Sequence, residues 1–100
     1  MPIGVLVLQI HLSDSHSLKD RRNALRRLKD RLRGKYNVAI AELNDEAHWQ
    51  AAQIGIAAIG NDANYLRGLL DRAGRESLQV LHGEDVSLGE IEILDYDAPA

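Results

Sequence analysis

The chain has 100 residues, 45% of them hydrophobic and 27% charged, a composition typical of one soluble globular domain. It contains no cysteine, which excludes disulfides, thiolate metal sites, iron–sulfur clusters and cysteine nucleophiles and fits a cytoplasmic protein. The net charge of −3 conceals an asymmetry, because residues 17–36 carry +7 and the rest of the chain carries −10. We therefore expect one domain over residues 1–100, acidic as a whole but with one basic surface.

Residues 3–12, IGVLVLQIHL, are rich in β-branched and aliphatic side chains and predict a strand. Strand alternation places one set of side chains toward the core, namely Leu6, Leu8, Ile10 and Leu12, and the set Val5, Val7, Gln9 and His11 on a more open face. This apolar run is too short for a membrane span and lacks the basic start of a signal peptide, so we expect no membrane association.

The segment from Ser15 to Tyr36 predicts one long amphipathic helix. Ser17 followed by Asp20 resembles a capping box, and Gly34 is typical of a helix end. The expected apolar stripe consists of Leu18, Leu25, Leu28, Leu32 and Tyr36. Nine of the twelve basic residues of the chain lie in this segment, and five of them share one flank of the helix: Lys19, Arg22, Arg26, Lys29 and Arg33.

The remaining elements are predicted by alternation, by helical spacing and by turn residues. They are a strand over residues 37–43, a strand from about residue 50 to residue 59, a helix capped by Asn61 or Asp62 that ends near residue 81, and a strand over residues 86–96. Gly74 within the second helix marks a bend or a close packing contact. The order βαββαβ predicts an α+β, ferredoxin-like fold, with a four-stranded antiparallel sheet and both helices on one face.

The entry to the first helix, Ser15-His16-Ser17, has three interpretations. The serines cap the helix; or the site binds an anion, because a helix N-terminus with Lys19 and the neighbouring Arg21 and Arg22 attracts phosphate; or His16 and a serine form the base and nucleophile of a phosphoester-type enzyme. The sequence offers no acid that would orient His16, so we assign no catalytic residue.

The basic flank has two interpretations of equal weight. It is either a solvated helix face that the acidic last strand balances, or a surface that binds the phosphates of a polyanion. Arginine outnumbers lysine there, which suits two-pronged contacts with phosphate. The four histidines of the chain lie singly, so we expect no metal site and no cofactor.

The open face of the sheet is the basis of a separate prediction. Its side chains are small and apolar, among them Val5, Val7, Ala39 and Ala41. A face of this kind is typical of a surface that a second copy or a protein partner covers. We therefore keep a homodimeric interaction module as an alternative function.

Several stretches resemble the YlxP-like family of small bacterial proteins, a domain of unknown function. They are residues 3–6 (IGVL), 15–22 (SHSLKDRR), 28–33 (LKDRLR), 37–38 (NV), 41–42 (AE), 49–50 (WQ) and 60–62 (GND), and together they extend over nearly the whole chain. The resemblance implies a ferredoxin-like fold. Family members are often encoded beside translation-initiation and ribosome-maturation factors, which implies a role near RNA or the ribosome and no particular catalytic residue.

Overall fold

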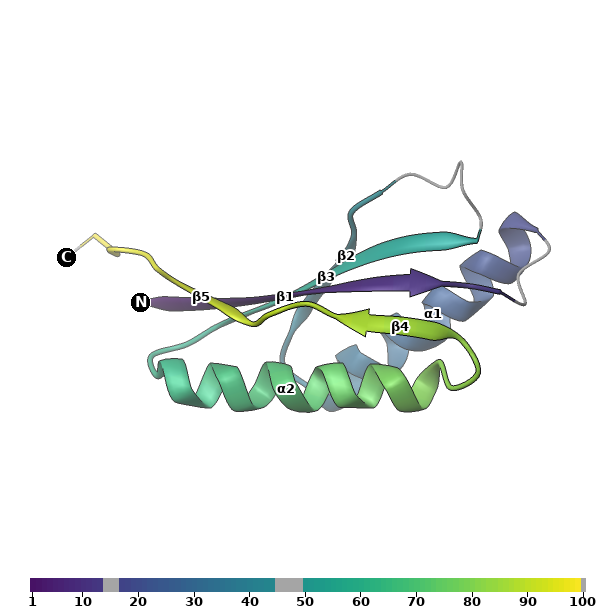
Figure 1. Cartoon of the computed structure of the whole chain (residues 1–100). Coiled ribbons are helices and arrows are strands. Elements are labelled where there is room, and N and C mark those ends of the chain that lie inside the picture. The colour runs from purple at the N-terminus through teal and green to yellow at the C-terminus, as the bar shows by residue number, and fades with distance from the viewer. Residues whose placement is uncertain (14–16, 45–49, 100) are drawn as a thin grey trace.

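The computed structural model describes residues 1–13, 17–44 and 50–99, and it contains one antiparallel sheet with two helices (Figure 1). The elements are β1 (Pro2–His11), α1 (Leu18–Lys35), β2 (Ala39–Glu42), β3 (Ala51–Ile59), α2 (Ala63–Val80), β4 (Asp85–Leu88) and β5 (Glu92–Asp95). The strand order is β2-β3-β1-β4, and β5 pairs with the other half of β1. The predicted α+β, ferredoxin-like fold is confirmed.

The long pair β1 and β3 forms the middle of the sheet, in a register that runs from Ile3 opposite Ile59 to His11 opposite Ala51. The predicted inward set of β1, Leu6, Leu8, Ile10 and Leu12, is buried, together with Ile54 and Ile56 of β3. The two helices cover this face alone, since their buried leucines belong to the same core cluster. The alternation of β1 therefore gave the correct inner face.

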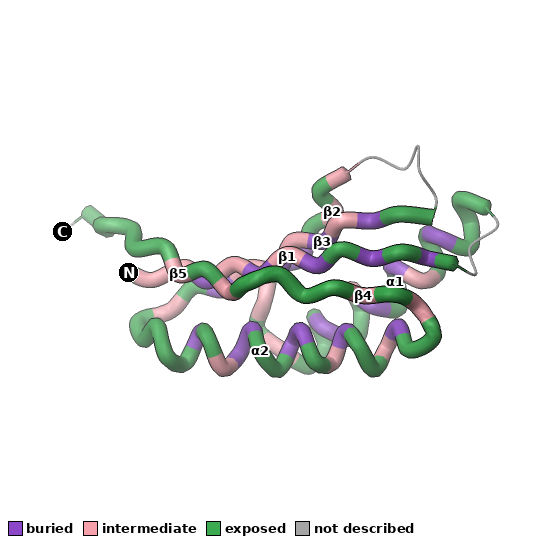
Figure 2. Tube along the Cα trace, viewed as in Figure 1, coloured by how far each residue is buried: buried purple, intermediate pink, exposed green. Residues whose placement is uncertain are grey.

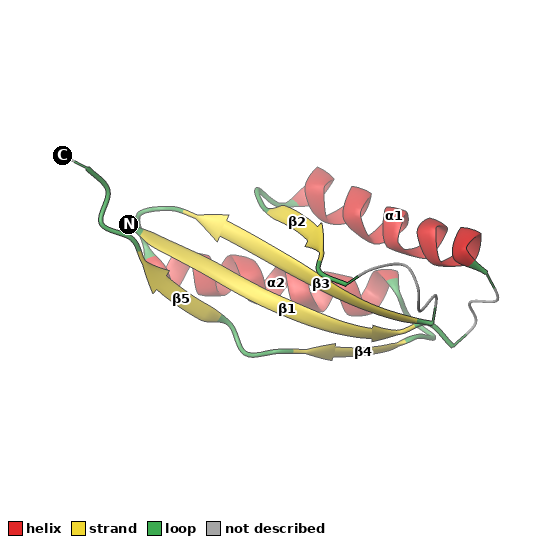
Figure 3. Ribbon diagram, turned by 90° about the horizontal axis from the view of Figure 1, so that it is seen from above, coloured by secondary structure: helices red, strands yellow, loops and turns green. Residues whose placement is uncertain are grey.

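The two helices divide the covered face between them (Figure 3). Helix α1 packs beside the short strand β2, whereas α2 packs against β1, β3 and β4. This arrangement places α1 at one side of the sheet and the β4–β5 edge at the other, which becomes important for the distribution of charge. No helix in the described part of the chain is long and apolar enough to cross a membrane.

Helix α1 begins as the sequence predicts and ends later. Ser17 is the N-cap, and its hydroxyl oxygen accepts a hydrogen bond of 3.2 Å from the backbone N–H of Asp20. The helix continues through Gly34 to Lys35, so the prediction that Gly34 ends it is wrong. Leu18 was predicted to lie on the apolar stripe but is 39% exposed, and the core position one turn later is occupied by Arg21, which is fully buried.

Helix α2 is capped by Asp62, one of the two predicted candidates, and its carboxylate accepts hydrogen bonds from the N–H groups of Asn64 and Tyr65. Gly74 is a close-packing position, because a Cβ placed there would lie 3.0 Å from Cδ2 of Leu6. Ser77 is buried and its hydroxyl donates to the carbonyl of Ala73 at 2.9 Å, as a hydroxyl in a helix interior often does.

The predicted last strand is two strands, β4 and β5, separated by a bulge. Leu88 pairs with Leu8 and Glu92 pairs with Val5. The chain therefore advances four residues from Leu88 to Glu92 while β1 advances three, from Val5 to Leu8. The N–H of Gly89 donates to the carbonyl of Val7 at 2.9 Å, and Arg67 donates to the carbonyl of Ile91 at 3.4 Å. One extra residue reverses the alternation, which is why a single strand was the wrong prediction.

The structure of α1 gives a direct stability test. Gly34 lies in the last turn of α1 without a positive φ, and a Cβ placed there would have no heavy atom within 4 Å. We expect Gly34→Ala to stabilise the protein by about 0.5–1 kcal/mol, because alanine loses less backbone entropy than glycine in a helix. Urea denaturation measures the change.

Gly74→Ala is the matched control, since it makes the same substitution in the other helix but places the methyl group against Leu6 and Leu88. We expect it to destabilise the protein. If both variants shift the urea midpoint in the same direction by the same amount, the assignment of Gly34 to an unobstructed position in the last helical turn is wrong.

Candidate anion-binding site

A buried ion pair fixes the orientation of α1 against the sheet. The guanidinium of Arg21 is fully buried, and its Nη2 contacts Oε1 of Glu42 on β2. The same Nη2 donates to the backbone carbonyl of Ala51 on β3 at 3.3 Å. Arg21 therefore joins α1 to two strands, and we assign it to the fold, whereas the sequence had grouped it with the anion motif.

The sequence contains a signal for this pair. Arg21 lies four residues before Leu25 and seven before Leu28, which is the spacing of the buried stripe. Glu42 lies two residues after Ile40 in β2, so the two side chains point to the same face of the sheet, and the side chain of Ile40 is buried there. An arginine and a glutamate at two core positions, in elements that pack together, indicate a buried pair.

With Arg21 turned inward, its neighbours on α1 line a hollow of about 240 Å³ between α1 and β2. Its basic lining residues are Arg22, Arg26, Lys29 and Arg33, and Leu25, Asp30, Glu42 and Arg21 complete the wall. The cationic row from Arg22 to Arg33 extends over about 16 Å of helix, at a rise of about 1.5 Å per residue. Four of the five residues of the predicted basic flank are thus brought together.

These cations differ in how they are held. Arg33 donates from Nη2 to the carbonyl of Ile40 at 3.2 Å, which satisfies a backbone acceptor of β2, the strand at the sheet edge. Within the described residues, Arg26 and Lys29 form no ion pair. Lys29 is half-buried at the side of the hollow, whereas Lys19 is exposed in the first turn and does not line it.

Part of the positive charge of α1 is neutralised on the opposite flank, by Glu76 of α2. Oε2 of Glu76 contacts Nη1 of Arg31 at 3.0 Å, and Oε1 contacts Nζ of Lys35 at 2.8 Å. The hydrogen bond from Lys35 lowers the pKa of the Glu76 carboxyl, and the same bond raises the pKa of Lys35. This cluster, which we call the Glu76 clamp, joins the two helices.

The acidic end of the chain does not balance the row of cations. Residues 84–97 contain six acidic residues and no basic one, and they form β4, β5 and the segments beside them. This edge is exposed and lies across the sheet from β2 (Figure 2). Three strand spacings of about 4.8 Å separate β2 from β4, and this distance exceeds the screening length of about 8 Å at physiological salt.

The remaining predicted site residues have separate positions. Ser17 is a helix cap, as described above. Ser15 and His16 lie outside the described residues, so the interpretations that rest on them, the enzyme centred on His16 included, stay predictions. No group of three or more His, Cys, Asp or Glu side chains arranged to hold a metal ion occurs in residues 1–13, 17–44 and 50–99.

The sequence of the chain matches a known family. A family model described as "Protein of unknown function (DUF503)" matches residues 3–96. The chain belongs to this family. It is also 36% identical over 59 residues to "Uncharacterized protein YlxP" of Bacillus subtilis (strain 168), a match that covers 59% of this chain and 64% of that protein, less than two thirds of its length.

Solved structures with a similar fold have unrelated descriptions. One is a C-terminal segment of the alpha subunit of aIF2 from Pyrococcus abyssi, with a TM-score of 0.56 and 19% identity, covering 87% of this chain and 49% of that one. Another is SnoaB, a cofactor-independent oxygenase from Streptomyces nogalater, with a TM-score of 0.58, 9% identity and coverage of 97% and 95%. A de novo designed protein, Foldit4, has a TM-score of 0.55 at 11% identity and covers 96% and 98%. At these identities the likeness supports the DUF503 fold and not a function.

In the described part of this DUF503 chain, the sheet face opposite α1 and α2 carries no helix. Its exposed apolar side chains include Leu43 and Leu94, each 52% exposed, and Ile59, which is 59% exposed. Val5 and Val7 are half-buried between their strand neighbours. Coverage of this face by a second copy or a protein partner stays a prediction of the sequence.

The Glu76 clamp predicts a defined dependence of stability on pH. Because folding lowers the pKa of Glu76, this residue stabilises the protein at pH values above its ordinary pKa of 4.5. The contribution is lost as the pH falls through the pKa that Glu76 has in the folded protein. Lys35 behaves in the opposite way, because folding raises its pKa. Its stabilising contribution is complete at pH values below the ordinary pKa of 10.5 and is lost as the pH rises through the pKa of Lys35 in the folded protein. We therefore expect Glu76→Gln to lower the urea midpoint at about pH 7, and the difference from the wild type to shrink toward about pH 2.

Asp71→Asn is the control for this experiment. Asp71 is half exposed and pairs with Arg75 one turn along the same helix, whereas the Glu76 side chain is only 11% exposed and bridges two helices. We expect the Asp71 variant to change stability less. A Glu76 variant whose destabilisation is the same at both pH values would contradict the clamp.

Proposed function

We propose that this protein binds the phosphate backbone of RNA, free or within a ribosomal particle, through the basic row of α1, and that it does so without turning over a substrate. The observation that carries the proposal is the hollow between α1 and β2, where Arg22, Arg26, Lys29 and Arg33 line one side of a single helix. The buried pair beneath them fixes the direction in which they point.

Electrostatics favours a polyanion over a small acidic partner. The row is long enough to contact several phosphates in sequence, and arginine binds phosphate with two parallel hydrogen bonds. The acidic edge lies at the far side of the sheet, so the row keeps its local potential although the protein has a net charge of −3. An approaching polyanion is attracted to α1 and repelled by β4 and β5.

The expected mode of binding is sequence-tolerant. Contacts to phosphates give affinity and orientation but do not distinguish bases. Among the residues that line the hollow there is no aromatic side chain on which a base could stack. The choice of RNA among polyanions rests on the genomic context that the family resemblance implies.

The test replaces three of the cations that line the hollow, Arg22→Gln, Arg26→Gln and Lys29→Gln, in one chain. Binding is measured by fluorescence anisotropy with a labelled RNA hairpin of about 16 base pairs, at salt concentrations from about 20 to 200 mM. Each lost phosphate contact lowers the slope of log affinity against log salt by about 0.7–0.9, so we expect the slope to fall by about 2. At about 100 mM salt we expect at least a tenfold loss of affinity.

The control replaces three exposed arginines of α2, Arg67→Gln, Arg72→Gln and Arg75→Gln, and so changes the net charge by the same amount. We expect it to keep the wild-type slope within about 0.5. The proposal fails if the wild type does not bind the hairpin at about 20 mM salt, or if the two triple variants lose affinity equally. Sedimentation with purified ribosomal subunits in the same salt series extends the test to the particle.

A further inference from the structure

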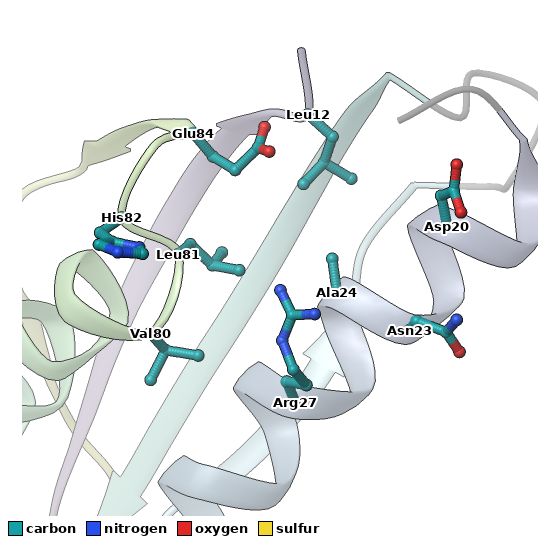
Figure 4. Close-up of a pocket in the computed structure, with 9 residues that line it drawn as sticks. All are labelled: Leu12, Asp20, Asn23, Ala24, Arg27, Val80, Leu81, His82 and Glu84. Carbon is teal, nitrogen blue, oxygen red and sulfur yellow. The ribbon is translucent and has the colours of Figure 1, made fainter. Parts of the chain in front are cut away.

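A second hollow lies on the other side of α1, between this helix and the end of α2 (Figure 4). Its volume is about 530 Å³, within the range of small-molecule sites. The apolar part of its wall comes from Leu12, Ala24, Val80 and Leu81. The polar part comes from Asp20, Asn23, Arg27, His82 and Glu84.

One end of this hollow carries a guanidinium. Arg27 is exposed on α1, its guanidinium lies between the two walls in Figure 4, and it forms no ion pair within the described residues. His82 follows the C-terminus of α2 on the opposite wall. An adjoining hollow shares Arg27 and His82 and adds Arg31 and Asp30, so two arginines lie along this end of the space between the helices.

The other side holds an acceptor without a donor. Oε2 of Glu84 has less than 1 Å² of accessible surface and no hydrogen-bond partner in the described structure. The turn that carries it is fixed, because the N–H of Glu84 donates to the carbonyl of Leu81 at 3.0 Å and Gly83 has a φ of 91° that favours glycine. Leaving a buried carboxylate oxygen without a donor costs free energy, and a ligand N–H would offset that cost.

We propose that this hollow binds a nucleoside monophosphate whose base carries an amino group. The phosphate contacts Arg27, which lies at the end of the hollow away from Glu84 in Figure 4. The base lies against the apolar wall, and its amino group donates to the carboxylate of Glu84, after a small rotation about the terminal bond of that side chain, which is a soft torsion. Carboxylates accept from exocyclic amino groups in this way, as in the contact of glutamate with the amino group of cytosine.

The charges that face the hollow define the orientation of the ligand. Asp20 and Glu84 repel a phosphate from their end, and Arg27 attracts it to the other. Uracil has no amino group that could donate to Glu84, so we expect the site to prefer cytosine and adenine nucleotides over uracil nucleotides. The site lies on the opposite flank of α1 from the RNA-binding row, and either proposal can fail without the other.

The experiment is an amide chemical-shift titration of the ¹⁵N-labelled full chain with the nucleoside 5′-monophosphates of cytosine, adenine and uracil, and with inorganic phosphate. We expect saturable shifts at residues 23–27 and 80–84 with the cytosine or adenine nucleotide, at a Kd below about 1 mM. Uridine monophosphate should bind about tenfold more weakly, since one buried hydrogen bond is worth about that factor. Inorganic phosphate should bind more weakly still.

Two variants and one control locate the contacts. Arg27→Gln should raise the Kd of the preferred nucleotide at least tenfold. Arg72 is an exposed arginine of α2, and Arg72→Gln should leave this Kd unchanged. Glu84→Leu should remove the difference between the cytosine and uracil nucleotides and leave phosphate binding intact. The proposal is overturned if no nucleotide gives saturable shifts up to about 10 mM, if the shifts fall instead on residues 22, 26 and 33, or if cytosine and uracil nucleotides bind the wild type equally.

Discussion

The buried pair of Arg21 and Glu42 is the constraint on which the arrangement of α1 depends. A buried charge without its partner costs several kcal/mol, so the pair tolerates only the rotation of α1 in which the two side chains meet. That rotation turns Leu25, Leu28 and Leu32 into the core and leaves Leu18 at the surface. It also decides which basic residues lie beside β2 and which face α2.

From this single orientation the basic helix acquires two different flanks. One flank presents Arg22, Arg26 and Lys29 beside the edge strand, across the sheet from the acidic β4–β5 edge. The other flank faces α2, where Glu76 neutralises Arg31 and Lys35 and where Arg27 lines a separate hollow. A segment that carries +7 is therefore divided into a structural cation, a clamp and two surfaces with different chemistry. The family name gives no function, and these surfaces are what the structure adds to it.

The sequence predicted the parts of the fold that follow from local periodicity. Alternation in β1, the cap Ser17, Asp62 as one of the two candidate caps and the order of the elements up to β4 were correct, because each is encoded within a few residues. The errors concern pairings between distant segments. The burial of Arg21 depends on Glu42, and the break between β4 and β5 depends on the register of Leu88 and Glu92 against β1.

The same distinction applies to the candidate site. Helical spacing alone placed Arg22, Arg26, Lys29 and Arg33 together, and the structure brings these four to one hollow. The distance between that hollow and the acidic strands could not be predicted from the sequence, because it depends on the order of the strands in the sheet. The role of Arg33 was also missed, since its hydrogen bond to Ile40 forms only when β2 lies beside α1.

Two adjacent arginines on α1 differ in role: Arg21 belongs to the fold, and we propose that Arg22 binds RNA. The most direct measurement compares Arg21→Met with Arg22→Met, in urea denaturation and in hairpin-RNA binding corrected for the folded fraction. We expect Arg21→Met to cost about 3 kcal/mol of stability and to leave the RNA affinity of the folded protein within about twofold. Arg22→Met should leave stability within about 0.5 kcal/mol and weaken RNA binding several-fold. Equal losses of stability in the two variants, or a larger loss of RNA affinity in the Arg21 variant, would contradict the account.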